Sequence, residues 1–305
     1  MAPIGHLTQP TLRLDALARA RQRAALLPDC LAEARRVANT VIAGWHGRRK
    51  RGTGETFWQF RPYVDGESLS SIDWRRSARD DHLYVRDREW EAAHTIWLWA
   101  DQSPSMLYQS DAAPVAKESR ALVLMLALAE VLSRSGERIG CPGVMDPVAS
   151  RNAAERLALA LSHAPAQTGL PDLGQVGRMS DIVLISDFLD PGDALDRCIG
   201  PAAKRGIRGH AIEVSDPAEE SFPYAGRTEF RDPETGAKLV AGRAETIGAD
   251  YRRAWLARRE TLAEGVRRLG WTYLAHSTDR LASEALASAH VHLSGIPTAP
   301  RKVSA

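Results

Sequence analysis

From residue 95 onward, short apolar runs alternate with longer stretches in which apolar residues recur at helical spacing. The clearest runs, at 95–100 and 181–189, have the length and composition of buried strands. Weaker strands are predicted at 138–144, 208–214 and 271–276, and helices at 117–134, 153–163, 193–205, 245–269 and 279–289. Strands that alternate with helices pair in parallel and are covered on both faces. The pattern therefore predicts an α/β domain with a central, mostly parallel sheet.

The helix predicted at 117–134 has almost no polar face. A helix that is apolar nearly all round and this short belongs in the interior of a protein. The chain has no run of about 18 consecutive apolar residues, so no membrane span is predicted. Its first residues lack the basic and apolar regions of a signal peptide. We therefore expect a cytoplasmic protein, in which the three widely spaced cysteines stay reduced.

Before residue 93 the pattern is different. Loosely spaced leucines among Ala and Arg predict two helices in the first forty residues, separated at Pro28 and Asp29. Residues 52–91 contain short segments rich in aromatic residues and arginine, which predict irregular strands and turns. The expected domains are an N-terminal helical and β-rich extension (1–92), an α/β domain (93–292) with a hairpin insertion near 222–242, and a disordered tail (293–305).

Composition adds one asymmetry to this picture. The 305 residues are 44% hydrophobic, so we expect a sizeable core. Their net charge is only +2, so we expect no general attraction to polyanions. Basic residues nevertheless gather in the run Arg48, Arg49, Lys50 and Arg51. This run could contact nucleic acid, phosphate or an acidic partner, or it could be a solvated loop.

The densest candidate chemistry follows the strand at 95–100. Asp101, Ser103 and Ser105 present one carboxylate and two hydroxyls within five residues, and Asp187 lies near the end of the strand predicted at 181–189. Hard oxygen ligands of this kind suit Mg²⁺. Ligands of parallel sheets bind beyond the carboxyl ends of the strands, where these residues are expected. The same residue types also cap turns and helices for backbone reasons alone, and that structural interpretation stays open.

Several enzyme classes do not fit the sequence. It contains no G-x-x-x-x-G-K-[ST] phosphate loop and no G-x-S-x-G nucleophile elbow. The remaining enzyme alternative is a Mg²⁺-dependent phosphoester hydrolase that uses Asp101 and Asp187. Position 103 holds serine where such chemistry favours a second carboxylate, so a binding role is preferred.

These motifs carry a family resemblance. Asp101-x-Ser103-x-Ser105 and Asp187 resemble parts of the metal site of von Willebrand factor A domains. The preceding stretch resembles the bacterial proteins catalogued as domain of unknown function 58, through Gly52-x-Gly54-Glu55, Arg61-x-Tyr63-x-x-Gly66-Glu67, Ser71-Ile72-Asp73-Trp74-x-x-Ser77-Ala78-Arg79 and Leu83-x-Val85-Arg86. The resemblance covers roughly residues 45 to 275. It implies an A-like (Rossmann-like) core, a MoxR-type AAA+ ATPase as partner and an unknown protein client.

The resemblance also implies roles for single residues. Ser103 and Ser105 would bind the metal directly, and Asp101 and Asp187 mainly through water. The family pattern expects a threonine from an intervening loop, but Pro171 stands at that position, so Thr168, Asp172 or a water would have to replace it. Mg²⁺ is the expected ion, with Mn²⁺ and Ca²⁺ as alternatives, and one coordination position would accept an acidic side chain of a partner.

A second surface is suggested by residues before the α/β domain. Asp73, Trp74 and Arg79 could join the basic run 48–51 in binding a partner or an anion. Alternatively, Trp74 packs and the arginines pair with local carboxylates, which is the interpretation we favour. Taken together, the sequence predicts a non-enzymatic protein-binding adaptor with a metal-ion-dependent adhesion-type site.

Overall fold

The computed structural model describes residues 14–46, 59–64, 68, 70, 72–79, 82–87, 94–189 and 193–294. The chain divides into two compact units, one formed by residues 1–42 with 94–305 and the other by residues 43–93. This division differs from the expected boundary at 92, because the N-terminal helix shares a core with the α/β domain. The expected disordered tail lies almost entirely outside the described residues.

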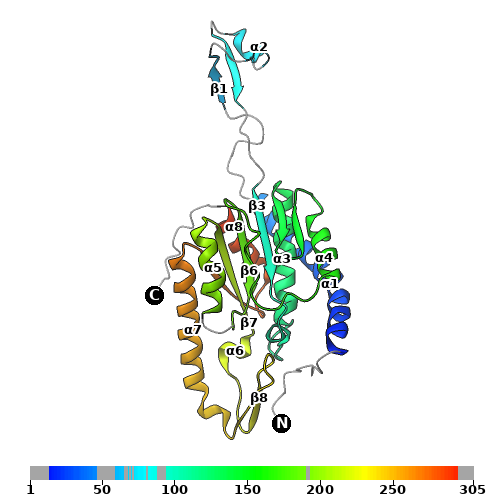
Figure 1. Cartoon of the computed structure of the whole chain (residues 1–305), viewed down its shortest axis with the longest axis vertical. Coiled ribbons are helices and arrows are strands. Elements are labelled where there is room, and N and C mark those ends of the chain that lie inside the picture. The colour runs from blue at the N-terminus through cyan, green and yellow to red at the C-terminus, as the bar shows by residue number, and fades with distance from the viewer. Residues whose placement is uncertain are drawn as a thin grey trace. The chain divides into compact units, whose positions relative to one another are not determined.

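A six-stranded sheet forms the centre of the larger unit, in the order β10-β7-β6-β3-β4-β5 (Figure 1). Its strands are β3 (Thr95–Ala100), β4 (Arg138–Cys141), β5 (Met145–Val148), β6 (Asp181–Ser186), β7 (Arg208–Ser215) and β10 (Thr272–Ser277). All neighbours pair in parallel except β4 and β5, which are antiparallel. The predicted α/β class and mostly parallel sheet are confirmed, while β5 was not predicted.

Helices cover both faces of this sheet (Figure 1). They are α3 (Lys117–Arg134), α4 (Ala153–His163), α5 (Ala194–Lys204), α7 (Gly248–Arg268) and α8 (Ala282–Leu293), while the short helix α6 (Pro217–Ser221) lies beyond the end of β7 (Figure 1). Trp97 and Trp99 of β3 pack in one core cluster with Ile199 of α5 and Val266 of α7. Helices α3, α4 and α8 pack together on the opposite face.

Helix α1 (Leu14–His46) is continuous, so the prediction of two helices separated at Pro28 is wrong. A proline inside a helix removes one hydrogen bond and costs about 3 kcal/mol. Here that cost is offset by burial of one face at helical spacing, through Leu27, Cys30, Ala34, Ala38 and Val41. Because α1 packs on α3, the apolar surface of α3 is enclosed, and residues 120–133 of α3 are all buried.

The smaller unit contains a two-stranded antiparallel sheet of β1 (Gln59–Pro62) and β2 (Tyr84–Asp87). The short helix α2 (Trp74–Ser77) lies between these strands in the sequence. Ile72 forms a bridge with Val85, and both side chains are buried. The expectation of short strands and turns in this region is confirmed for the described residues.

A hairpin of β8 (Thr228–Arg231) and β9 (Lys238–Ala241) interrupts the alternation, as predicted. It lies at the end of the larger unit where β3, β6 and β7 finish (Figure 1). Two single-turn elements, η2 (Pro104–Leu107) and η3 (Ala244–Thr246), follow β3 and β9. Within the described residues, no helix has both the length and the apolarity needed to cross a membrane.

Candidate functional site

The strand order places a switch point beside β3. The chain leaves β3 for β4 on one side and later returns to β6 on the other side, so the loops after β3 and β6 diverge. Ligand sites of parallel sheets lie in the crevice outside such a point. The Asp101 N–H donates to the carbonyl of Ile185 at 2.8 Å, which holds the two strand ends together. We call Asp101, Ser103, Ser105 and Asp187 the strand-end site.

Asp101 is fixed by both of its carboxylate oxygens. Oδ1 accepts from the Ser103 N–H at 2.8 Å, and Oδ2 accepts from the Ser186 hydroxyl at 2.7 Å. The residue is only 2% exposed. Burial raises the pKa of Asp101 to about 6, although the hydrogen bonds from Ser186 and Ser103 favour the charged form. The nearby carboxylate of Asp187 raises this pKa further, so the site would gain from a cation.

The two hydroxyls of the strand-end site converge. Ser103 Oγ and Ser105 Oγ are 3.0 Å apart, and both residues are buried. This arrangement arises because η2 begins directly after Ser103 and its Met106 is completely buried. Adjacent oxygens around an octahedral Mg²⁺ with bonds of ~2.1 Å lie ~3.0 Å apart. The distance is also that of a hydrogen bond between the two hydroxyls.

Asp187 has a partner that the sequence did not indicate. Lys117 at the start of α3 is fully buried, and its Nζ lies 2.8 Å from Asp187 Oδ2 and 2.6 Å from Glu219 Oε1. Burial disfavours the ammonium, but attraction to these two carboxylates dominates and raises the pKa of Lys117 above its usual value. A permanent positive charge therefore lies at the strand-end site.

The loop expected to supply the threonine does approach this region. Gln167 and Gln102 exchange two hydrogen bonds of 2.8 and 2.9 Å, which pair the loop with the segment after β3. Thr168 itself is exposed. Asp172 Oδ1 accepts from the Gly174 N–H at 2.8 Å, so this carboxylate is engaged within its own loop. The structure thus brings the loop, but no identified threonine ligand, to the site.

A carboxylate from the hairpin also reaches the strand-end site. Glu234, in the turn between β8 and β9, accepts a hydrogen bond of 2.9 Å from the Ser105 N–H. The turn sequence was recognised only as a hairpin signal. Lys117 could have been suspected, because a charged residue opens an otherwise apolar helix. Glu219 belongs to the capping box Asp216-x-x-Glu219, which is visible in the sequence.

The residues of the strand-end site fit a hard cation in part. The hydroxyl pair and the adjacent Asp101 have the right chemistry and spacing, whereas Asp187 is already paired with Lys117. In the part of the chain that the structure describes, no cluster of three or more His, Cys, Asp or Glu side chains has the arrangement of a metal centre. Any metal here would therefore depend chiefly on Ser103 and Ser105.

The second suggested surface lies in the smaller unit. The basic residues at 48–51 lie outside the described residues. Asp73 caps α2, with its Oδ1 accepting from the Arg76 N–H at 3.0 Å. Trp74 is 61% exposed, so the expectation that it packs is wrong. Arg79 is exposed as well. An exposed tryptophan beside an exposed arginine keeps the partner-surface interpretation open.

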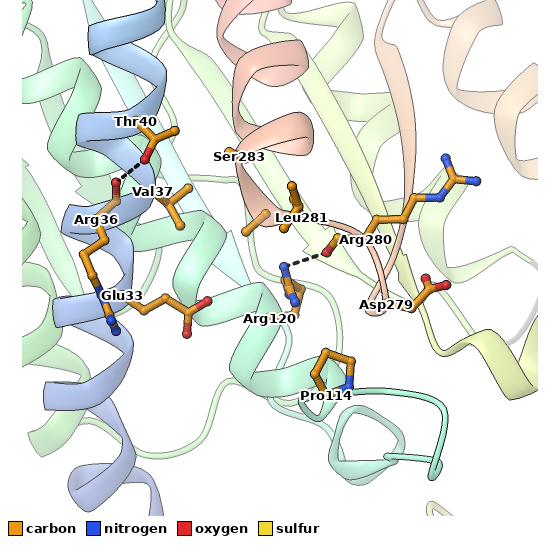
Figure 2. Close-up of a pocket in the computed structure, with 11 residues that line it drawn as sticks. Glu33, Arg36, Val37, Thr40, Pro114, Arg120, Asp279, Arg280, Leu281 and Ser283 are labelled. Atoms are coloured by element: carbon orange, nitrogen blue, oxygen red, sulfur yellow. Dashed lines mark hydrogen bonds between the residues drawn. The ribbon is translucent and has the colours of Figure 1, made fainter.

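A cavity of about 250 Å³ lies elsewhere in the larger unit, between α1, α3 and the start of α8 (Figure 2). Arg120 donates to the carbonyl of Arg280 at 3.0 Å and to that of Thr278 at 3.0 Å, which closes one side. Glu33 and Asp279 balance the arginines that line it. None of the four residues of the strand-end site lines this cavity.

Comparison with known proteins places the chain in a family. Residues 59–261 match the model of the family described as "Protein of unknown function DUF58", and the chain belongs to that family. It is similar to the uncharacterized protein Rv1480 of Mycobacterium tuberculosis, with 28% identity over 261 residues that cover 79% of this chain and 80% of the relative. An uncharacterized protein of Mycobacterium bovis, Mb1516, matches to the same extent.

Solved structures show a weaker likeness. The conserved hypothetical protein BatB from Bacteroides thetaiotaomicron has 15% identity and a TM-score of 0.40, covering 67% of this chain and 100% of that protein. An aerotolerance-related membrane protein from Bacteroides fragilis gives the same values.

Proposed function

We propose that this DUF58 protein is a non-enzymatic adaptor whose larger unit is a von Willebrand factor A-like domain. Its strand-end site binds an acidic side chain of a partner protein. The observation that carries the proposal is the pair of buried hydroxyls, Ser103 and Ser105, 3.0 Å apart beside Asp101. This arrangement offers donors and hard oxygen ligands at the edge of the sheet where ligands bind.

Mg²⁺ is the proposed bridge between the site and the partner. Ser103 and Ser105 would hold the ion, with Asp101 behind them. A bound ion would supply the positive charge that attracts a partner carboxylate. Lys117 already neutralises part of the negative charge of Asp187, so the site should not bind Mg²⁺ as tightly as a site with two free carboxylates.

The proposed partner is a MoxR-type AAA+ ATPase, acting on an unknown client in a chaperone-like or complex-maturation role. This part of the proposal rests on the family resemblance of the motifs. The hydrolase alternative is less well supported by the site. Position 103 holds serine where this chemistry favours a second carboxylate.

The test is a binding measurement between this protein and the MoxR-type ATPase of the same genome. With Mg²⁺ we expect association that weakens at least about tenfold in EDTA, since one charge-assisted contact is lost. Asp101→Ala and Ser105→Ala should weaken it similarly. Ser162→Ala, a matched serine change on α4 away from the site, should bind as the unaltered protein does.

Two outcomes would contradict parts of this proposal. Equal binding in Mg²⁺ and EDTA would exclude the metal bridge but keep the recognition site. Turnover of a generic phosphoester that requires Mg²⁺ and disappears in Asp101→Asn would favour the hydrolase. Calorimetric titration of the isolated protein with MgCl₂ separates metal binding from partner binding.

A further inference from the structure

The β8–β9 turn places a carboxylate on the strand-end site from far away in the sequence. Glu234 Oε1 accepts from the Ser105 N–H at 2.9 Å, across 129 positions of the chain. Ser105 also carries one of the two converging hydroxyls. An acidic side chain of the protein itself therefore contacts the same residue that the proposed function offers to an acidic side chain of a partner.

The turn is built to present this side chain. Asp232 Oδ1 accepts from the Glu234 N–H at 2.9 Å, and Asp232 Oδ2 accepts from the Thr235 hydroxyl at 2.5 Å. The Gly236 N–H donates to the Asp232 carbonyl at 2.9 Å, and Gly236 has a φ of 74° that favours glycine. These bonds lie within the turn, so its shape does not depend on the contact with Ser105.

The hairpin is anchored by aromatic rings next to its turn. Phe230 of β8 packs on Phe222 and Tyr224, with ring centroids 5.6 and 5.2 Å apart. The hydroxyl of Tyr224 is hydrogen-bonded to that of Tyr108, which directly follows η2. This anchor keeps the turn close to the strand-end site.

The rest of the hairpin is much less tightly held. Leu239 and Val240 of β9 are 61% and 52% exposed, and Glu234 itself is exposed. A segment with few buried apolar contacts opens at low cost. The exposed side chain of Glu234 can therefore leave Ser105 while the aromatic anchor of the hairpin stays in place.

We infer that Glu234 is an internal ligand that occupies the position of the partner's acidic side chain. The inference rests on the proposed function and specifies its partner. That partner presents a glutamate or aspartate on an exposed turn, which exchanges with Glu234 at the Ser105 N–H and the neighbouring hydroxyls. The apparent affinity for the partner is then the intrinsic affinity multiplied by the fraction of molecules in which Glu234 has left Ser105.

The probe for this exchange is a fluorescein-labelled peptide of residues 228–241, with its ends joined by a disulfide to keep the turn. A second peptide carries Gln in place of the Glu234 equivalent. Both are titrated by fluorescence anisotropy, in MgCl₂ and in EDTA, against the full-length protein, Glu234→Gln and Glu229→Gln. Glu229 is the matched control, because it is an exposed glutamate of the same hairpin that pairs with Lys238 at 2.8 Å.

We expect Glu234→Gln to bind the glutamate peptide at least about tenfold more tightly than the unaltered protein, because a charge-assisted hydrogen bond to Ser105 becomes a weaker neutral one. It should also prefer the glutamate peptide to the glutamine peptide by a similar factor. Glu229→Gln should behave as the unaltered protein. Equal unfolding midpoints of the three proteins would show that the gain does not come from a change in fold.

Two results would overturn the inference, and they separate it from the proposed function. If all three proteins bind the glutamate peptide equally and more tightly than the glutamine peptide, the site recognises a carboxylate but Glu234 does not occupy it. If no protein distinguishes the two peptides, the site does not recognise a carboxylate, and the proposed function fails as well.

Discussion

Lys117 shows how a single side chain changes the chemistry expected of the strand-end site. A buried ammonium is stable only where carboxylates compensate the loss of water. Asp187 and Glu219 do so at 2.8 and 2.6 Å. The positive charge that a metal alone was expected to supply is therefore supplied in part by the protein. Asp101 has no such partner, which is why burial raises its pKa to about 6.

Replacement of Lys117 by an apolar residue of similar length tests this charge balance. Lys117→Met leaves Asp187 and Glu219 buried without their cation, so the free energy of unfolding should fall by about 3–5 kcal/mol. Urea denaturation measures this change. The matched variant Lys204→Met, on the exposed side of α5, should change stability by about 0.5 kcal/mol or less. A loss below about 1 kcal/mol for Lys117→Met would show that the pair is not a buried ion pair in solution.

At the scale of elements, close packing between β7, β10 and α7 fixes the edge of the sheet. Gly209 lies on β7 beneath the ring of Trp271, and a Cβ on this glycine would be only 2.0 Å from the ring. Trp271 is buried, and its indole N–H donates to the Ile207 carbonyl at 3.1 Å. The ring therefore cannot move aside without losing that hydrogen bond.

Gly209→Ala should consequently lower the free energy of unfolding by at least about 2 kcal/mol, as overpacking of a core does. The matched control is Gly265→Ala in α7, where a Cβ would meet only two side-chain tips, of Arg268 and Asp196, at 4.0 Å. Alanine favours a helix over glycine, so this control should gain about 0.5–1 kcal/mol. Thermal or urea unfolding that showed equal effects for both variants would contradict the packing at Gly209.

At the scale of the whole molecule, the N-terminal helix and the α/β domain form one unit although residues 43–93 separate them in the sequence. Arg35 of α1 pairs with Glu155 of α4, and Arg134 of α3 donates to Asn39 of α1 at 2.8 Å. Arg23 of α1 donates to Gln102 at 2.9 Å, beside the strand-end site. Helix α1 therefore supports the segment that carries Ser103 and Ser105.

Removal of residues 1–46 should expose the apolar surface of α3 that α1 covers. We expect the truncated chain to aggregate or to bind a hydrophobic dye, and to lose its cooperative thermal transition. Removal of residues 295–305 should shift the midpoint of the thermal transition by no more than a few degrees, which corresponds to a change in stability of about 1 kcal/mol. A cooperative, monomeric product of the first truncation would contradict the assignment of α1 to this unit.

The sequence by itself determined the elements whose local pattern is strong. The strand at 95–100, the helix at 117–134 and the hairpin were found where predicted, and the strand predicted at 181–189 was found at 181–186, because burial imposes a clear pattern on apolar residues. It also identified Asp101, Ser103, Ser105 and Asp187 as neighbours, because parallel strands end at one edge. The prediction that a helix ends at Pro28 was wrong, because packing of α1 on α3 outweighs the unfavourable effect of a proline inside a helix.

Only the tertiary structure decided which charges meet at that edge. Lys117 pairs with Asp187 and with Glu219, and Glu234 accepts from the Ser105 N–H. These contacts join residues far apart in the sequence and leave no local pattern. Local periodicity reports whether a residue faces the core, but it does not report which distant side chain shares its position. The sequence therefore determined the fold class and the oxygen-bearing side chains of the strand-end site, and tertiary packing determined the ammonium and the carboxylate that lie beside them.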